Sequence, residues 1–302
     1  MPKLIIDDAY LKTLQKISTE GVTKPDRTDV GSSKSVFGHS FHHSIQKVGN
    51  GIYRNLPFIQ CRWYEPKHSF TELMWMLNGY TDNQYLLDRG VNFWTAQTSE
   101  EFLKDNPRVP VGTIGKGYGR QFRNFSGVDQ LMNAYESLRD DPYSRRHIIN
   151  LWNVPNLEYM SLPPCHFIYT FMCSPDIEGN ITLNLHFHMR SNDVYLGLPY
   201  NLGFSGIFLI LMAEILGYNV GEIYYTSTDA HLYENQLETV ERLLSVVNEE
   251  GVRSDGLPLL APQMTILKPL NTFEDMLSIE WDDVAVDCYN KGRKGYNVKM
   301  AV

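Results

Sequence analysis

The segment Ile181–Arg190 constrains the fold of this chain more than any other stretch. Every second position is apolar, and the positions between are polar and end at Arg190. The apolar set is Ile181, Leu183, Leu185, Phe187 and Met189, and the polar set is Thr182, Asn184, His186, His188 and Arg190. Because successive side chains of a β-strand point to opposite faces, this period of two predicts a strand with one apolar and one polar face.

Hydrophobic periodicity and turn signals predict further elements on both sides of this strand. Helices are expected over residues 7–16, 69–77, 84–89, 129–138, 200–216 and 230–247. Strands are expected over 35–45, 147–152, 165–173 and 223–227, with a turn-rich segment over 26–33 and a basic loop over 288–302. Since no linker separates two cores, the sequence predicts one domain, residues 1–302, of the α+β class around a large mixed sheet packed against helices.

Composition limits the classes of partner and location. The 302 residues are 43% hydrophobic and 21% charged, which is typical of a soluble protein with a buried core. A net charge of −8 argues against binding to duplex nucleic acid, which depends on lysine and arginine at phosphates. The four cysteines lack regular spacing, which indicates reduced thiols in a cytoplasmic protein. Acids in residues 1–15 argue against a signal peptide, and Glu214 interrupts the short apolar run 204–215, so no membrane span is expected.

A single cysteine follows two prolines in Pro163-Pro164-Cys165-His166. A lone cysteine is most often a small, inert core residue. Here, however, three arginines and a serine occur within about 25 residues along the chain, and guanidinium groups favour the reactive thiolate and bind phosphate. They are Arg145, Arg146, Arg190 and Ser191. The pattern indicates a nucleophile beside a bound anion.

The adjacent pair Arg145 and Arg146 raises a geometric problem. On a strand the two side chains would point to opposite faces. Both could reach one ligand only from a turn or across a subunit boundary, and a solvated basic pair is the alternative. Arg27, in the turn-rich segment, is a further candidate for the same anion.

Two polar residues stand out in helical segments. Glu72 is the single acid in an apolar helix, so it is either a buried carboxyl with a raised pKa or an exposed acid at the helix edge. Asn201 lies at a helix start, where its amide could match the N3–H and O4 edge of a uracil or simply cap the helix. His231 and Tyr233, two residues apart after a strand, are a weak signal alone.

No metal or dinucleotide site is expected. His186 and His188 share a strand face, but no cysteine or carboxylate nearby completes a ligand set. The chain has neither a Walker loop nor a GxGxxG motif.

Ten short segments, in order along nearly the whole chain, resemble the thymidylate synthase family. They are Asp26-Arg27-Thr28, Thr71-Glu72-Leu73-Met74-Trp75, Phe93-Trp94, Tyr118-Gly119-Arg120-Gln121, Ser144-Arg145-Arg146, Pro164-Cys165-His166, Arg190-Ser191-Asn192-Asp193, Leu196-Gly197-Leu198-Pro199-Tyr200-Asn201, Asp229-Ala230-His231-Leu232-Tyr233 and Ala301-Val302.

The resemblance implies a role for each candidate. Cys165 would attack C6 of the pyrimidine of a dUMP-type nucleotide. Its 5′-phosphate would be held by Arg27, Arg190 and Ser191, joined by Arg145 and Arg146 of a second subunit. This arrangement implies an obligate homodimer with a sheet face at the interface.

The remaining roles concern sugar, base and folate. By resemblance, His231 and Tyr233 bind the deoxyribose hydroxyl, Asn201 reads the base, Glu72 organises proton transfer near O4, and Tyr118 lies near the C5 proton. The co-substrate 5,10-methylenetetrahydrofolate would contact Trp94, Asp193 and Val302. It would also contact the loop and helix residues Leu196, Gly197 and Tyr200. Asp193 counts among the substrate-binding residues as well.

Several departures from the family pattern bear on the product. Hydride transfer to the exocyclic methylene at C5 gives dTMP, whereas water gives a hydroxymethyl group. Synthases usually follow the first tryptophan with an aspartate and a second tryptophan. The departures here are Thr95-Ala96-Gln97 after Trp94, Met189 before Arg190, Leu202-Gly203-Phe204-Ser205 after Asn201, and Arg62 in place of a lysine.

These departures favour a phage-type dUMP hydroxymethylase, which would act in the host cytoplasm. A divergent thymidylate synthase is the alternative. A non-catalytic nucleotide- or RNA-binding relative is a second alternative, but the retention of Cys165, Glu72, Tyr118 and the arginines argues against it.

Overall fold

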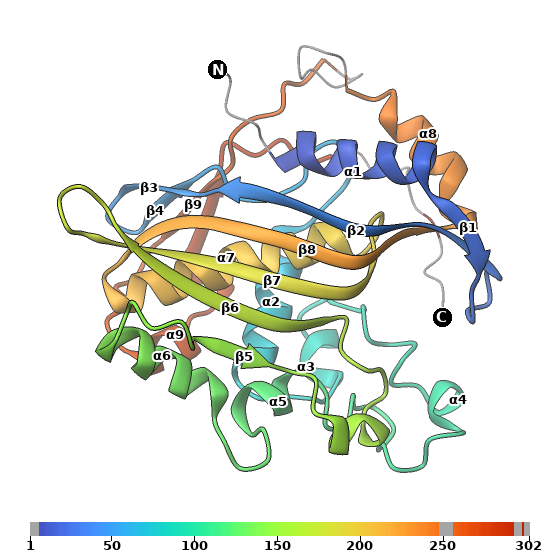
Figure 1. Ribbon diagram of the computed structural model, residues 1–302, viewed down its shortest axis with the longest axis horizontal. Helices are drawn as coiled ribbons and strands as arrows, with labels where there is room; N and C mark the ends of the chain where they lie inside the picture. The colour runs from blue at the N-terminus through green and yellow to red at the C-terminus, as the bar shows by residue number, and fades with distance from the viewer. Residues whose placement is uncertain (1–5, 248–255, 293–297, 299–302) are drawn as a thin grey trace.

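The computed structural model describes residues 6–247, 256–292 and 298. Two sheets form its framework (Figure 1). The larger sheet has the strand order β1-β2-β8-β7-β6-β5, and the smaller has the order β10-β9-β4-β3. The strands are β1 Val22–Pro25, β2 Ser32–Ser44, β3 Gln46–Gly49, β4 Ile52–Arg54, β5 Ile148–Asn150, β6 His166–Pro175, β7 Ile181–Asp193, β8 Asn219–Tyr233, β9 Gln263–Ile266 and β10 Val284–Asp287.

The predicted two-faced strand is β7, at the centre of the large sheet. Leu183, Leu185, Phe187 and Met189 are at most 1% exposed, so the apolar face lies in the core as expected. β7 pairs antiparallel with β6 and parallel with β8. A parallel pair needs a crossover connection, and helix α7 (Leu198–Leu216) supplies it.

Helix α7 packs against the apolar face of the sheet and lies behind the strands in Figure 1. Two glycines allow its close approach to the rest of the core. A Cβ at Gly203 would lie 1.9 Å from the Tyr64 hydroxyl, and one at Gly206 would lie 2.5 Å from Cγ of Pro57. The helix is longer than predicted, and it is the one described helix long and apolar enough to cross a membrane. Because 83% of that apolar window is buried inside the protein, α7 is a core helix here.

The remaining helices surround these sheets. Tyr10, Leu14 and Ile17 of α1 and Leu73 of α2 are fully buried, and both helices join the same hydrophobic core as β7 and α7. The helices are α1 Ile6–Glu20, α2 Pro66–Leu77, α3 Gln84–Leu87, α4 Glu100–Leu103, α5 Gly119–Arg123, α6 Gln130–Asp140, α8 Leu237–Leu244 and α9 Phe273–Leu277, with 3-10 turns η1 Val154–Tyr159, η2 Glu234–Gln236 and η3 Trp281–Asp283. The predicted α+β class with a large mixed sheet is confirmed.

The helix predicted over residues 230–247 is wrong in its first part. Strand β8 continues to Tyr233, and the helix begins at Leu237 after the η2 turn. Ala230 pairs with Val36 of β2 on one side and with Asn192 of β7 on the other. Pairing on both sides outweighs the helical tendency of the local sequence, because sheet preference depends on cross-strand neighbours.

Other differences concern short elements. The turn-rich segment 26–33 is the connection of a β1–β2 hairpin, and the small sheet was not predicted at all. Its strands are three or four residues long, too short for a clear period of two. The predicted basic loop over 288–302 falls largely outside the described residues.

The central strand provides a test of the core. Leu185→Ala removes a side chain that is 1% exposed, and we expect it to lower the free energy of unfolding by about 2–5 kcal/mol. Thr182→Ala, on the opposite face of the same strand, is the control and should change it by less than about 1 kcal/mol. Urea unfolding followed by circular dichroism measures both. Equal effects would contradict the assignment of the two faces.

Candidate active site

Cys165 lies immediately before β6, between the two prolines and the first residue of the strand. Arg190 near the end of β7 is fixed beside it, because its Nε donates to the Pro164 carbonyl at 2.8 Å and Nη2 to the Pro163 carbonyl at 2.9 Å. Nη2 is also 3.7 Å from Sγ of Cys165. The fork geometry of the guanidinium therefore holds a fixed positive charge against the thiol.

The electrostatic setting of the thiol has two opposed parts. Burial raises the pKa of Cys165, while the charges of Arg190 and Arg27 lower it. The backbone N–H of Cys165 donates to the Tyr118 hydroxyl at 2.8 Å. The free protein thus keeps the thiol protonated at neutral pH, with two cations placed to stabilise the thiolate once the proton leaves.

Tyr118 reaches this point through an unusual backbone conformation. Its φ is 20° and its ψ is −87°, a backbone conformation that residues other than glycine rarely adopt. Gly119 then allows the next turn, because a Cβ there would lie 2.3 Å from the Tyr80 carbonyl oxygen. The Tyr118 ring lies 5.4 Å from that of Trp94 and stacks at 4.5 Å on His166. Burial lowers the pKa of His166 to about 3, so this imidazole is neutral.

Glu72 of α2 is a buried carboxyl, which excludes the exposed alternative. It is 6% exposed, and its Oε1 accepts a hydrogen bond from Nε1 of Trp94 at 2.9 Å. Burial raises the pKa of Glu72 to about 7, although the Trp94 bond lowers it. A carboxyl with this pKa can both take up and release a proton at neutral pH.

The end of β8 brings a second group of residues to the thiol. His231 is 6% exposed and its ring lies 5.0 Å from that of Tyr233. Nε2 of His231 is buried and has no hydrogen-bond partner among the described residues. Arg27 is exposed, and its charge acts on both Cys165 and Tyr233. A buried, unpartnered nitrogen and an exposed guanidinium suit a ligand that carries hydroxyl and anionic groups.

Asp193 ends β7 and organises the loop to α7. Its Oδ1 accepts from the Leu196 N–H at 2.9 Å, Oδ2 from Gln236 at 3.0 Å, and its carbonyl from the Gly197 N–H at 2.9 Å. Burial raises the pKa of Asp193, while His231 lowers it. The backbone N–H of Asn201, one turn into α7, donates to the Gly197 carbonyl at 3.1 Å, so the asparagine is part of the helix and not its cap.

Aromatic rings line the region between α2 and the start of α7. The Tyr200 ring lies 4.4 Å from Phe93, 5.1 Å from Tyr64 and 6.2 Å from His68. Trp94 follows Phe93 directly and reaches Glu72. These tilted rings form an aromatic wall, and Trp94 connects it to the carboxyl.

Two predicted residues stand apart from this cluster. Arg145 and Arg146 are both exposed and lie in the loop before β5, not on the strand. Val302 lies outside the described residues. Ser191, by contrast, lies beside Arg190 on β7, opposite Asp229 of β8.

Three polar residues near this cluster were not predicted as site residues from the sequence. Asn192, Tyr225 and Gln97 are 3%, 0% and 7% exposed. Asn192 follows the break in alternation after Met189, and Gln97 was noted only as a departure from the family pattern. What distinguishes these three residues is a polar side chain in a buried position, and burial cannot be read from a single sequence.

The histidines of β7 bind neighbouring side chains. Nε2 of His186 lies 2.7 Å from the Thr226 hydroxyl, and that of His188 lies 3.2 Å from the Thr228 hydroxyl. Among residues 6–247, 256–292 and 298, no three His, Cys, Asp or Glu side chains are grouped to hold a metal ion.

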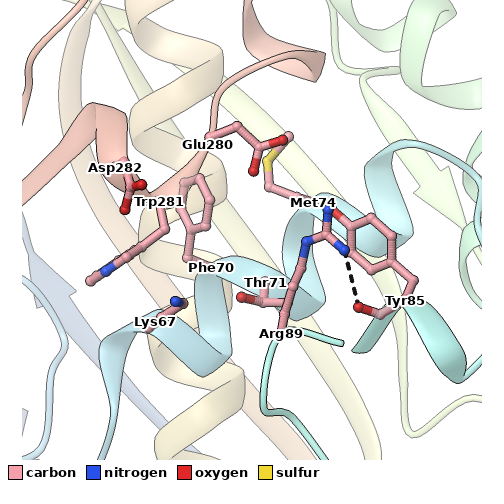
Figure 2. A pocket seen from close by; sticks show the side chains of 9 residues that line it. All are labelled: Lys67, Phe70, Thr71, Met74, Tyr85, Arg89, Glu280, Trp281 and Asp282. Atoms are coloured by element: carbon pink, nitrogen blue, oxygen red, sulfur yellow. Dashed lines mark hydrogen bonds between the residues drawn. The ribbon is translucent and has the colours of Figure 1, made fainter. Parts of the chain in front are cut away.

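A separate pocket of about 280 Å³ lies on the opposite side of α2 (Figure 2). Lys67, Phe70, Thr71 and Met74 line it from one helix face, whereas Glu72 points away from that face. Arg89 lies across the Tyr85 ring and donates to the Tyr85 carbonyl at 3.3 Å. Glu280 and Asp282 complete a wall of mixed charge, and none of the candidate site residues lines this pocket.

The fold and this cluster place a thiol beside the anchored positive charge of Arg190, an arrangement that suits an enzyme with a cysteine nucleophile. Comparison with known proteins agrees. The family model "Thymidylate synthase" matches residues 8–302. A thymidylate synthase of Mycoplasma mobile is 31% identical over 314 aligned positions, which cover 98% of this chain and 100% of that protein. The chain therefore belongs to the thymidylate synthase family of one-carbon transferases, as the sequence resemblance predicted.

The raised pKa of Glu72 predicts a stability effect. The unfolded side chain loses its proton near pH 4.5, but the folded one holds it to about pH 7. Stability is therefore unaffected below pH 4.5 and falls as the pH rises from 4.5 to 7, by roughly 3 kcal/mol in total. Glu72→Gln removes this loss, so at pH 8 we expect the variant to be the more stable protein.

Urea unfolding of the wild type and Glu72→Gln at pH 5 and pH 8 measures this difference. The exposed Glu101→Gln is the control and should show no such pH dependence. A Glu72→Gln variant that gains nothing between pH 5 and pH 8 would show that the carboxyl ionises as in water.

Proposed function

We propose that this protein transfers a one-carbon unit from 5,10-methylenetetrahydrofolate to C5 of dUMP, with Cys165 as the nucleophile. The observation that carries the proposal is the anchored guanidinium of Arg190, 3.7 Å from Sγ of Cys165. A cation so placed stabilises the thiolate and binds a substrate phosphate. Addition of Sγ to C6 turns C5 into a carbon nucleophile and divides a difficult substitution into easier steps.

The proposed phosphate site combines residues of two subunits. Arg27, Arg190 and Ser191 would contribute from the subunit that holds Cys165. Arg145 and Arg146, exposed on a loop at the edge of the sheet, would enter the site of a partner. This arrangement would resolve the geometric problem of two adjacent arginines, because the pair of each chain would bind the phosphate in the site of the partner subunit.

Sugar and base would be bound by hydrogen-bonding side chains. The unpartnered Nε2 of His231 and the Tyr233 hydroxyl suit the deoxyribose hydroxyl. The amide of Asn201 suits the O4 and N3–H edge of uracil, because one amide both donates and accepts.

The residues around Asp193 fit a folate. The aromatic wall of Trp94 and Tyr200 offers stacking surfaces for flat rings, and Asp193, Leu196 and Gly197 form the adjoining loop. Val302, outside the described residues, is also assigned to this site by family resemblance. When bound, the folate supplies the methylene carbon.

Proton transfers fall to the chain's own side chains. Glu72, with a pKa of about 7, can exchange a proton near O4 of the base. The Tyr118 hydroxyl lies at the Cys165 backbone and is placed to assist loss of the C5 proton.

For the product, we propose 5-hydroxymethyl-dUMP, formed when water adds to the exocyclic methylene at C5. Gln97, three residues after Trp94, is 7% exposed and its Oε1 has no partner among the described residues. A buried, unpartnered amide oxygen is usually bound by water, which suits a site that admits water. Thymidylate synthesis, with dTMP and dihydrofolate as products, is the second candidate, and the name of the Mycoplasma mobile relative favours it.

The proposed enzyme is a homodimer of one-domain chains, residues 1–302, in the cytoplasm. The sheet face opposite α7 would form the interface. Ile148 and Met172, on strands β5 and β6, are 48% and 59% exposed in the single chain. On the same face, aromatic rings stack across strands, with His42 on Tyr224 at 4.1 Å and Tyr224 beside His186 at 4.9 Å. An apolar and aromatic face of this kind is typical of a surface that a second copy covers.

Product identification tests the proposed function. Incubation with dUMP and methylenetetrahydrofolate should yield 5-hydroxymethyl-dUMP and tetrahydrofolate, separated by chromatography and identified by mass. We expect Cys165→Ser to lower turnover roughly 10⁴-fold, because a hydroxyl cannot replace the thiolate. Cys288→Ser is the matched control and should keep full activity, since this exposed thiol lies outside the site.

Two outcomes would change the assignment. Formation of dTMP with dihydrofolate would establish the synthase in place of the hydroxymethylase. Unchanged turnover in Cys165→Ser would exclude covalent catalysis by this thiol.

Mixing two inactive variants tests the shared site. Cys165→Ser and Arg146→Ala, unfolded and refolded together, form mixed dimers in which one site carries both changes and the other carries neither. We expect the mixture to recover about a quarter of wild-type activity, because half of the dimers are mixed and each has one intact site. No recovery, with dimers confirmed by sedimentation, would mean that Arg146 serves its own subunit.

A further inference from the structure

Asn192 connects two side chains that no other contact joins among the described residues. It is 3% exposed and lies next to last in β7. The Tyr225 hydroxyl of β8 donates to its Oδ1 at 2.9 Å. Its Nδ2 in turn donates to Oδ1 of Asn201 at 3.1 Å. A phenol, a buried amide and the proposed base-reading amide thus form one chain of hydrogen bonds.

The donors and acceptors in this chain of hydrogen bonds have a fixed order. A phenol has a single hydrogen, and Tyr225 is fully buried, so its hydrogen needs an acceptor inside the protein. Oδ1 of Asn192 is that acceptor, and the NH₂ group of Asn192 must then face Asn201. Asn201 can meet an NH₂ group only with its oxygen. Rotating either amide by half a turn would place two donors or two acceptors together.

The orientation of Asn201 decides which pyrimidine it matches. Uracil offers an acceptor at O4 and a donor at N3–H, whereas cytosine offers a donor at N4 and an acceptor at N3. With its oxygen held by Asn192, Asn201 can accept from N3–H with the second lone pair and donate to O4 through Nδ2. A rotated amide would present the same two groups in the reverse order and would match cytosine.

We infer that Tyr225 and Asn192 are positioning residues that set the preference for uracil over cytosine nucleotides by fixing the Asn201 amide. The inference rests on the proposed function, in which Asn201 faces the base. The inference adds that the presence of an asparagine does not by itself select uracil, because the orientation of its amide decides which base it matches.

Gly197 leaves room for this pair of amides. A Cβ at this position would lie 2.9 Å from the Asp193 carbonyl oxygen and 3.6 Å from both Nδ2 of Asn192 and Oδ1 of Asn201. The loop that ends β7 therefore closes directly over the hydrogen bond between the two asparagines.

Two substitutions act on the chain of hydrogen bonds in different ways. Tyr225→Phe keeps the ring, which packs 4.9 Å from Phe41 and 5.5 Å from Phe187, but removes the directing hydrogen. Asn192→Asp, studied at pH 8, presents an acceptor to Asn201 and so favours the rotated amide.

The measured quantity is the ratio of kcat/KM for dUMP to kcat/KM for dCMP, supported by equilibrium binding of both nucleotides. We expect Tyr225→Phe to lower this ratio by about tenfold. Asn192→Asp should lower it further and raise the absolute kcat/KM for dCMP, which a merely structural role would not do. Tyr218→Phe is the matched control, because its hydroxyl donates to the Leu138 carbonyl at 2.8 Å, away from the base site, and should leave the ratio unchanged.

Folded variants, checked by circular dichroism, that lose activity equally with both nucleotides would overturn the inference, as would an unchanged ratio. Failure of the proposed function is a separate result. In that case the wild type would turn over neither nucleotide, and binding of dUMP and dCMP would still report whether the two positions control the choice of base.

Discussion

The parallel pairing of β7 with β8 is the constraint on which the rest of the site depends. Its register sets Ser191 opposite Asp229, Asn192 opposite Ala230 and Asp193 opposite His231. A parallel pair can form only with a long crossover, and the buried helix α7 both makes that connection and carries Asn201 in its first turn. One pairing therefore brings residues proposed to bind phosphate, sugar and base, which come from separate segments, to the same end of the sheet.

Burial shapes the chemistry at this end. Glu72, Cys165 and Asp193 all have raised pKa values because desolvation opposes their charged forms. The protein tolerates this cost at three neighbouring acids, which is more common at functional sites than elsewhere. Each acid has a compensating partner: Trp94 for Glu72, Arg190 for Cys165, and His231 with Gln236 for Asp193.

The sequence predicted what depends on local pattern. The alternation in Ile181–Arg190 was enough to predict β7 and its two faces, and the single acid in 69–77 was enough to suspect Glu72. Prediction from the sequence failed where contacts with residues distant in sequence determine the structure. Ala230 became strand because β2 and β7 pair with it, and the small sheet has strands too short to show a period. Asn192 and Tyr225 could not be predicted, because their importance lies in a contact across two strands.

In the proposed function, the cluster uses charged groups for the phosphate and amides for the base. The arginines hold an anion at any pH in the physiological range, and a phosphate site of this kind does not distinguish uracil from cytosine. Discrimination between bases falls to neutral amides, whose donors and acceptors are fixed only by their neighbours. We propose that the choice at C5 between water and hydride depends in the same way on buried side chains such as Gln97. Relatives that share the same charged residues could therefore differ in substrate and product through a few buried polar side chains.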